Sequence, residues 1–276
     1  MSSRGGREGE APPAPEPLAV PVLDSHCHLD IVGGDVGAQL DAARAVGVDT
    51  VVQIGVDLES SRLSARIATE HEHLWAAVAV HPNEAGLGAA TPEVLAEIEQ
   101  LAGQPRVVAV GETGLDHYRT GDEGRGPQEA SFRAHIAIAK RTGTTLVIHD
   151  REAHDDVLRV LAEEGAPERV VFHCFSGDAA MARACANRGY WMSFAGNVTF
   201  KNAGELREAA SVAPAELLLV ETDAPFLTPM PYRGRPNASY LIPLTMRALA
   251  QTRGDDLDEL CAAVAANGRA AFALPG

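Results

Sequence analysis

The sequence has few cysteines, no long apolar run and no excess of basic residues, and each shortage argues against a class of protein. Four cysteines in 276 residues form no CxxC pair, which is typical of the reduced thiols of an intracellular protein. No apolar run approaches the roughly 20 residues that span a bilayer. The formal net charge of −15 argues against a protein that coats nucleic acid along a basic face.

The N-terminal residues also lack the apolar segment of a signal peptide. They are rich in Pro, Gly and Glu, a composition that predicts a disordered tail over residues 1–20. We therefore expect a cytoplasmic protein with one domain over residues 21–276. We also expect a monomer, since nothing in the sequence indicates a stable protein partner. Deleting residues 2–18 is expected to change neither the melting temperature nor the activity.

The chain does contain an alternation of short β-branched runs and helical patterns rich in Ala, Leu and Glu. The runs predict eight strands, at residues 20–25, 50–54, 74–80, 107–111, 145–148, 169–172, 190–194 and 217–221. Helical patterns lie between them, for example at 57–71, 92–102, 128–142 and 151–164, and two more follow a loop over 229–243, at 242–252 and 257–272. Such alternation implies a parallel sheet. Eight units in this length predict a (β/α)8 TIM barrel, with a doubly wound open sheet as the alternative.

The side chains that can bind a metal follow the predicted strands. They are His26 and His28 after the first strand, His81 after the third, Glu112 after the fourth, His149 after the fifth, His173 after the sixth and Asp223 after the eighth. In a barrel these ends converge on one rim, where active sites are built. The other histidines fall in helical or loop stretches and are expected to be surface or capping residues, namely His71, His73, His117, His135 and His154.

The spacing of His26 and His28 suits a metal site, because residues two apart in an extended segment point to one face, ~6.6 Å apart along the chain. Glu112 could bridge two ions with its two oxygens, or it could pair with an arginine. Imidazole and carboxylate ligands suit Zn, Mn, Fe, Ni or Mg. Asp24 is expected to orient a ligand histidine, and Cys27 to be a small packing residue rather than a thiolate ligand.

The candidate ligands lie in short motifs that follow one another along the chain. The motifs are DSHCHL at 24–29, His81-Pro82, GETGLD at 111–116, VIHDR at 147–151, HCFSG at 173–177 and ETDAPFL at 221–227, followed by Arg233-Gly234 and Asn237. Taken in order, they closely resemble the motifs of the TatD family of metal-dependent deoxyribonucleases. The resemblance covers residues 23 to 272 and implies a TIM-barrel branch of the amidohydrolase-like metal hydrolases.

The resemblance also implies a centre of two divalent ions. One ion would be held by His26, His28, Glu112 and Asp223, and the other by Glu112, His149 and His173, with Glu112 as the bridge. His81 and Arg151 would contact the substrate phosphate. Glu221 would support the ligands or form a buried ion pair. Two residues depart from the family's pattern. Asp150 stands where Ser or Thr is usual and would place a negative charge near the mouth of the barrel, and Ser239 stands where a proline is expected.

These residues predict hydrolysis of phosphodiester bonds in DNA, most simply as an exonuclease on free or single-stranded ends. Two ions of Mg, Zn or Mn would activate a water molecule, with Asp223 as the expected general base. Two such ions against Glu112 and Asp223 leave a local charge of about +2, which would let an acidic protein bind a polyanion. The basic residues expected near the mouth are Arg151, Lys201, Arg233 and Arg235, with Arg233 as a further candidate for substrate binding.

Two other functions fit parts of the pattern. An amidohydrolase that cleaves a small amide, lactone or ester often has a carboxylated lysine at the end of the fourth strand, where this chain has Glu112. A non-enzymatic, metal-stabilised scaffold would be expected to have an incomplete ligand set, whereas the set here is complete. Both comparisons favour the nuclease.

Overall fold

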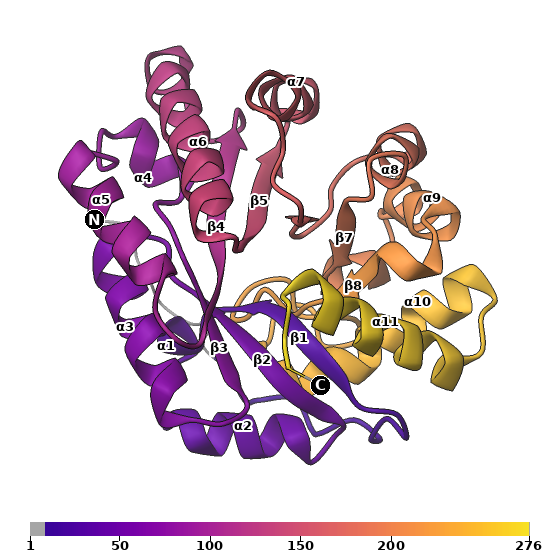
Figure 1. Ribbon diagram of the computed structural model, residues 1–276. Coiled ribbons are helices and arrows are strands. Elements are labelled where there is room, and N and C mark those ends of the chain that lie inside the picture. Colours follow the sequence, from indigo (N-terminus) through magenta and orange to yellow (C-terminus); the bar gives the residue numbers. More distant parts are fainter. Residues whose placement is uncertain (1–8, 276) are drawn as a thin grey trace. The chain divides into compact units, whose positions relative to one another are not determined.

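A computed structural model describes residues 9–275 and contains one eight-stranded sheet, whose strands follow one another in sequence order (Figure 1). The pairs β3–β4, β4–β5, β5–β6 and β7–β8 are parallel. All eight predicted strands are present, and their alternation with helices confirms the predicted (β/α)8 TIM barrel. The strands are β1 (Val22–Cys27), β2 (Val48–Ile54), β3 (Leu74–Val78), β4 (Val107–Asp116), β5 (Thr145–Arg151), β6 (Val170–Phe172), β7 (Trp191–Phe194) and β8 (Leu218–Val220).

Helices connect the strands, and three short 3₁₀ turns occur in the second half of the chain. Among residues 9–275 we find no helix that is both long and apolar enough to cross a membrane. The helices are α1 (Leu29–Val32), α2 (Val36–Arg44), α3 (Leu58–Glu70), α4 (Pro82–Gly86), α5 (Pro92–Ala102), α6 (Asp122–Thr142), α7 (His154–Glu164), α8 (Ala179–Ala186), α9 (Gly204–Val212), α10 (Ile242–Arg253) and α11 (Leu257–Ala271), and the turns are η1 (Gly196–Thr199), η2 (Ala215–Leu217) and η3 (Ser239–Leu241).

Local sequence explains where these helices begin and end. The side chains of Asp35, Asp57 and Asp178 each accept a hydrogen bond from a backbone N–H in the first turn of α2, α3 and α8. At the other end, α6 and α10 are followed by Gly143 and Gly254, whose φ angles of 67° and 75° lie in the left-handed region that glycine adopts without strain. The helices therefore stop where the sequence supplies a capping residue.

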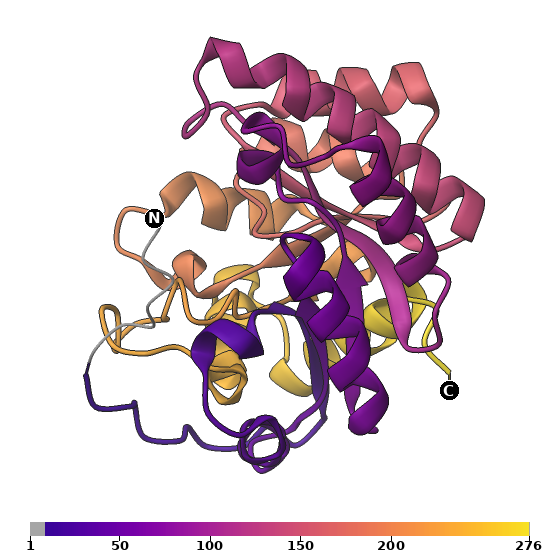
Figure 2. The same ribbon diagram turned by 90° about the vertical axis from the view of Figure 1, so that its left-hand side faces the viewer.

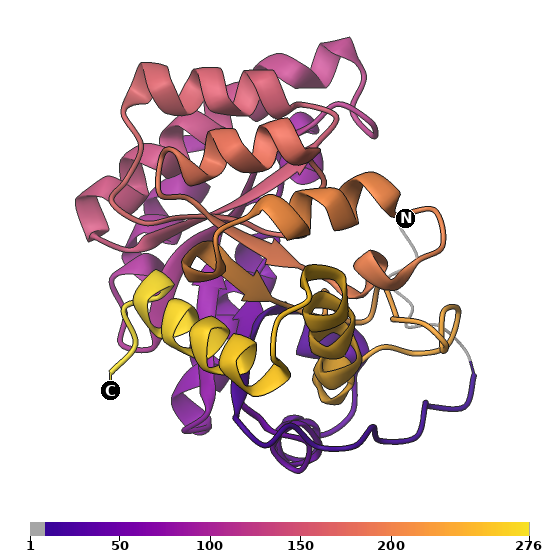
Figure 3. The same ribbon diagram turned by 90° about the vertical axis from the view of Figure 1, so that its right-hand side faces the viewer.

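The chain forms two compact units. The first contains the described residues up to Val52 together with Gly177–Arg188 and Met192–Gly268, and the second contains Gln53–Ser176, Gly189–Trp191 and the residues from Arg269 on. In the first unit α9 packs against both α8 and α10 (Figure 3). In the second, α3 and α6 pack on β3 and β4, with α5 between the two helices (Figure 2). Each unit thus buries its strands beneath its own layer of helices.

Pairing between β1 and the segment after β8 excludes the open-sheet alternative. The backbone N–H of Asp223 donates to the carbonyl of His26 at 2.9 Å, and that of His28 donates to the carbonyl of Ala224 at 2.9 Å. A doubly wound sheet begins near its centre and keeps two unpaired edges, so its first strand does not pair with its last. Here they are joined within the first unit, as barrel closure requires.

His135 is fully buried, so the expectation that it is a surface or capping residue is wrong. Its Nε2 accepts a hydrogen bond from the backbone N–H of Val80 at 3.1 Å, and its Nδ1 lies 2.7 Å from the carbonyl oxygen of Ser131. Both contacts are satisfied by the neutral ring with hydrogen on Nδ1. Burial lowers the pKa of His135 to about 4.

This low pKa predicts that the protein loses stability in acid. The unfolded chain binds a proton at His135 near pH 6.5 and the folded chain only near pH 4, so the contribution is intact above pH 6.5 and is lost as the pH falls toward 4. At about 1.4 kcal/mol per pKa unit, the loss is of the order of 3 kcal/mol. Urea unfolding of metal-free protein at pH 7, 5 and 4 measures it. His135→Gln should show a flatter pH dependence than the wild type, and parallel curves would contradict this role.

The segment before β1 packs against the loop that follows β8 and against α10. Figure 3 shows it running past this part of the chain. The guanidinium of Arg235 donates to the carbonyls of Glu10 and Ala11 at 2.8 and 3.1 Å, and Arg247 donates to the carbonyl of Glu16 at 2.9 Å. Leu18 is 6% exposed. Residues 1–8 of the predicted tail lie outside the described residues, but these contacts differ from what its composition led us to expect.

We therefore revise the expected effect of truncation. Deleting residues 2–18 should lower the melting temperature by several degrees, because burial of one leucine contributes about 1.5–3 kcal/mol and the carbonyl contacts of two arginines are lost as well. Deleting residues 2–8 is the matched control, since the difference between the two truncations isolates residues 9–18. Identical melting temperatures in a calorimeter would show that the packed segment adds no stability.

Candidate metal centre

The first group of candidate ligands lies at the junction of β1 and the segment after β8. One carboxylate oxygen of Asp223, Oδ1, is 3.6 Å from Nε2 of His28 and 3.8 Å from Nε2 of His26. The two imidazole rings are 5.1 Å apart and nearly perpendicular. Both histidines are buried, whereas Asp223 is 14% exposed. The predicted HxH spacing therefore does bring two imidazoles to one carboxylate.

Asp24 holds this junction together, although not in the way the sequence suggested. Its Oδ1 accepts from the backbone N–H of Thr222 at 2.9 Å, and its Oδ2 accepts from the Thr222 hydroxyl at 2.6 Å. Oδ1 also lies 3.3 Å from the backbone nitrogen of His26. Asp24 therefore fixes the backbone that carries His26 and Asp223 rather than the ring of a ligand. Burial raises the pKa of this carboxyl to about 6, against the lowering effect of its hydrogen bonds.

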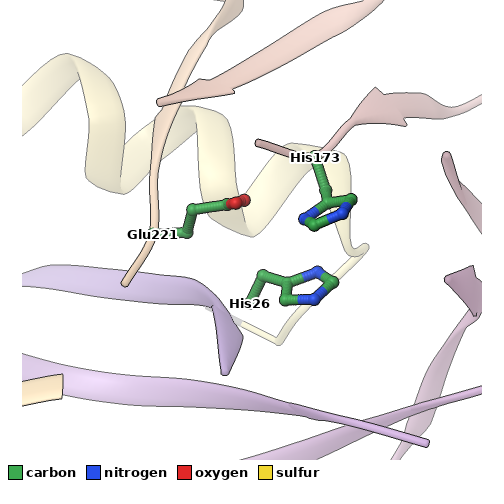
Figure 4. A group of neighbouring side chains, drawn as sticks. All are labelled: His26, His173 and Glu221. Carbon is green, nitrogen blue, oxygen red and sulfur yellow. The ribbon is translucent and has the colours of Figure 1, made fainter. Parts of the chain in front are cut away.

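Glu221 lies beside the first group. It is fully buried two residues before Asp223, and one of its carboxylate oxygens lies within 4.8 Å of a ring nitrogen of His26. Figure 4 shows its carboxylate extending alongside the His26 ring. A buried carboxylate next to an imidazole can support a metal ligand or bind an ion itself.

Glu112 lies at the centre of the second group. Its Oε2 is 2.9 Å from Nε2 of His173, 3.0 Å from Nδ1 of His149 and 3.6 Å from Nε2 of His81. The other nitrogen of His81 accepts from the backbone N–H of Asn83 at 3.0 Å, which turns Nε2 toward Glu112. The structure thus places His81, expected only to contact substrate, with Glu112 and His149 in one potential ligand set.

Asp116 lies within the GETGLD motif and contacts the second group, although no role was predicted for it from the sequence. Its Oδ2 lies 3.3 Å from Nε2 of His149, on the side of the ring away from Glu112. Its Oδ1 accepts from the backbone N–H groups of Tyr118 and Arg119 at 3.0 and 2.8 Å. Although burial opposes it, these contacts lower the pKa of Asp116 to about 2. For His149 the effects have the opposite sign. Burial acts to lower its pKa, but the contacts with Asp116 and Glu112 raise it.

We expect Asp116→Asn to reduce kcat/KM or metal affinity by roughly 10- to 100-fold, the usual effect of removing a carboxylate that orients a histidine ligand. The fold should persist, because the amide keeps the size of the side chain. Metal titrations followed by calorimetry and by hydrolysis measure the two effects. Asp122→Asn makes the same charge change on a side chain that is 92% exposed and is the control. Equal behaviour of the two variants would remove Asp116 from the site.

The donor set of each group fits a divalent ion. His26, His28 and Asp223 have ligand atoms within 4.8 Å of one another, and so do His81, Glu112 and His149. Imidazole nitrogen and carboxylate oxygen are the donors that Zn, Mn, Fe and Ni accept, and Mg also takes carboxylates. Among the described residues none of the candidate groups contains a cysteine.

The predicted basic residues have different partners. The guanidinium of Arg151 lies 4.0 Å from the centroid of the Tyr118 ring, and that of Arg233 lies 4.2 Å from the centroid of Phe200. Arg235 contacts the backbone of the N-terminal segment, and Lys201 is exposed. Arg151 and Arg233 therefore remain the better candidates for contact with substrate.

The expected effect of Asp150 on the mouth is wrong. Its side chain is 5% exposed, and its Oδ2 lies 2.7 Å from Nδ1 of His154 at the start of α7. In the strand β5 the neighbouring positions point to opposite faces. Because His149 points toward Glu112, the carboxylate of Asp150 is directed to the helix layer, where it contacts His154.

Comparison with known proteins agrees with the motifs. The sequence matches the family described as TatD related DNase over residues 23–273. The chain belongs to this family. A relative from Mycobacterium tuberculosis, named an uncharacterized metal-dependent hydrolase TatD, is 47% identical over 92% of this chain and 98% of its own length. A TatD relative from Erwinia amylovora, named a 3'-5' ssDNA/RNA exonuclease, is 35% identical over 84% of this chain and 91% of its own length.

A solved structure shares the TatD fold. The crystal structure of YJJV, a TatD homologue from Escherichia coli, matches with a TM-score of 0.85 and 29% sequence identity, covering 92% of this chain and 98% of that one. The TatD family of metal-dependent hydrolases therefore accounts for nearly all of the described chain.

Proposed function

We propose that this TatD-family metal-dependent hydrolase is a nuclease that cleaves DNA phosphodiester bonds, acting as an exonuclease on free or single-stranded ends. The observation that carries the proposal is the position of Glu112, whose one oxygen lies within 3.6 Å of three imidazole nitrogens. An amidohydrolase that uses a carboxylated lysine on the fourth strand would have a lysine where this chain has Glu112. The Erwinia amylovora relative, which is named a 3'-5' ssDNA/RNA exonuclease, supports the same choice.

The proposed centre holds two divalent ions. His26, His28 and Asp223 would hold one and His149 and His173 the other, with Glu112 contributing to both. In a (β/α)8 barrel the carboxyl ends of all strands form one rim, and these ligands lie on or directly after five of the strands. When bound, the ions supply positive charge to the reacting phosphate and acidify water.

The chain's own residues supply the remaining chemistry. Asp223 is partly exposed and its carboxylate can accept a proton from water, the role of a general base. Glu112 is buried and holds one oxygen within 3.6 Å of three imidazole nitrogens. Asp116 contacts the Nε2 side of the His149 ring and so orients Nδ1 toward Glu112. Arg151 presents a cation to the substrate phosphate.

A free DNA end suits this fold better than continuous duplex does. The rim of a barrel is a confined cup built from loops, so one strand enters it more easily than two. Few arginines or lysines would contact the backbone, because much of the chain's basic charge is already paired, as at Arg133 and Arg159. The activity should accordingly depend only weakly on salt.

A metal-restoration assay tests the proposal. Metal-free protein is supplied with Mg²⁺, Mn²⁺ or Zn²⁺ and given single-stranded DNA, duplex DNA, single-stranded RNA and a panel of amides and lactones. Strands labelled at either end distinguish nucleotide release from internal cleavage. We expect metal-dependent release of nucleotides from single-stranded DNA. If every nucleic acid stayed intact while a lactone or amide was hydrolysed efficiently, the amidohydrolase activity would replace the nuclease.

A further inference from the structure

Tyr118 is an exposed aromatic side chain next to the second ligand group. Among the large apolar side chains of residues 9–275, three are strongly exposed, namely Leu87, Tyr118 and Phe226, at 85, 60 and 46%. A single exposed ring is common and needs no function. Tyr118 differs because of the charged group that lies on its face and because of its place in the chain.

The Tyr118 ring and the Arg151 guanidinium form a stacked pair. The guanidinium carbon lies 4.0 Å from the ring centroid. The backbone fixes both residues, since the N–H of His117 donates to the carbonyl of Arg151 at 2.9 Å and the N–H of Tyr118 donates to Asp116 at 3.0 Å. The guanidinium covers part of the ring, and the remaining surface faces solvent.

The guanidinium of Arg151 makes no direct ion pair with a carboxylate, although the charge of Asp116 lies near it. Within the described part of the chain, Arg151 makes no ion pair at 4.0 Å or less. By contrast, Arg133 contacts three glutamates and Arg159 contacts two glutamates and an aspartate. In a protein with a net charge of −15, an arginine that makes no direct ion pair is available to an anion.

Asp116 connects this pair to the candidate metal ligands. One of its oxygens accepts from the Tyr118 N–H at 3.0 Å, and the other lies 3.3 Å from the ring of His149. The backbone of Tyr118 is therefore joined to His149 through a single carboxylate. This connection ties the segment that carries the stacked pair to the candidate ligands.

We propose that Tyr118 and Arg151 form a nucleotide subsite, in which the Tyr118 ring stacks on a nucleobase and the Arg151 guanidinium binds an adjoining phosphate. The inference rests on the proposed nuclease function and names a binding determinant for it. Aromatic rings that stack on bases and arginines that bind phosphates are the two elements by which proteins hold single strands without reading their sequence. The subsite therefore accepts any base, but only one whose face is free from duplex stacking.

An abasic scan tests the stacking partner. A 12-residue oligothymidylate carries one abasic residue, which is moved stepwise from the cleaved end, and kcat/KM is measured for each strand. For the wild type, one position should reduce kcat/KM by roughly 5- to 150-fold, the range measured when a stacking side chain is removed. Tyr118→Ser should show the same loss on the intact strand and no further loss at that position. Tyr118→Phe keeps the ring and should behave as the wild type.

A binding measurement separates affinity from catalysis. Metal-free protein is titrated into a fluorescein-labelled oligothymidylate and followed by anisotropy, so that no strand is cut. The dissociation constant should rise for Tyr118→Ser and stay unchanged for Tyr118→Phe. Arg151→Ala should weaken binding of intact and abasic strands by a similar factor, roughly 10-fold or more for a lost charge-assisted contact.

The outcomes distinguish the subsite from the proposed function. If the wild type cleaves DNA but Tyr118→Ser stays as sensitive to the abasic residue as the wild type, the stacking role is wrong and the ring only supports Arg151. If the wild type loses no activity at any abasic position, no base is stacked and the subsite is again wrong. If the wild type neither cleaves nor binds any strand, the nuclease function itself fails.

Discussion

Glu112→Gln is expected to remove bound metal and to reduce hydrolysis by more than roughly 100-fold, because even residues that only orient a ligand cost 10–100-fold when they are lost. The amide keeps the shape of a side chain that is 5% exposed but removes the charge that faces three imidazoles. The barrel should stay folded, because no strand pairing depends on this carboxylate. Metal analysis, kcat/KM on single-stranded DNA and circular dichroism measure the three effects.

The matched control for Glu112 is Glu168→Gln. Its side chain belongs to the same unit, is 89% exposed and makes only a 3.5 Å contact with Arg169. The control should keep its metal and its activity. If Glu112→Gln retained metal and turned over at a rate near that of the wild type, Glu112 could not be a ligand.

Asp223→Asn is expected to lower kcat by roughly 10²- to 10⁴-fold, the usual contribution of a positioned general base. Asparagine can still offer an oxygen to an ion but cannot take up the proton of an attacking water. The KM for DNA should change little, since Asp223 repels rather than binds phosphate. Steady-state kinetics at increasing metal concentration measure the effect.

The metal titration separates the two roles of Asp223. If the carboxylate only binds metal, excess metal should restore kcat in the asparagine variant. If it is the general base, kcat should stay low when the site is saturated. Full recovery of kcat would therefore exclude Asp223 as the base and leave it as a ligand.

The barrel and the gathering of the candidate ligands could be predicted from the sequence for one physical reason. In a parallel barrel every strand ends on the same rim, so residues near those ends that can bind metal gather there. The structure brings His26, His28 and Asp223 together in one group and Glu112 with His149 in another. The individual distances required the structure, because loop geometry decides which atoms meet.

The fourth strand is longer than the sequence predicted. It was predicted over 107–111, but β4 runs over Val107–Asp116 and pairs with β5 as far as Arg151, with a change of register between Val110 and Thr113. Glu112 therefore lies within the strand and not after it. Its even spacing from Asp116 in an extended segment was a signal that both carboxylates lie on one face.

His135 carried a readable signal too. It lies on α6 with Phe132, Ile136 and Ala139, and all four are buried. Positions three and four apart share one face of a helix, so the apolar stripe already assigned His135 to the core. The packing of the N-terminal segment had no such signal, because Arg235 and Arg247 bind carbonyl groups, which every residue has.

The two ligand groups become complete at different times during synthesis. The residues around Glu112 span positions 81 to 173, so all of them leave the ribosome well before Asp223 is synthesised. The first group is complete only when Asp223 is in place. The hydrogen bond between Thr222 and Asp24, which positions the backbone next to Asp223, joins residues 198 positions apart. Closing so long a loop is the slow, entropically costly step of folding. A nascent chain can thus acquire the Glu112 group early, whereas the ring of strands and the His26 group are finished only when β8 returns to β1.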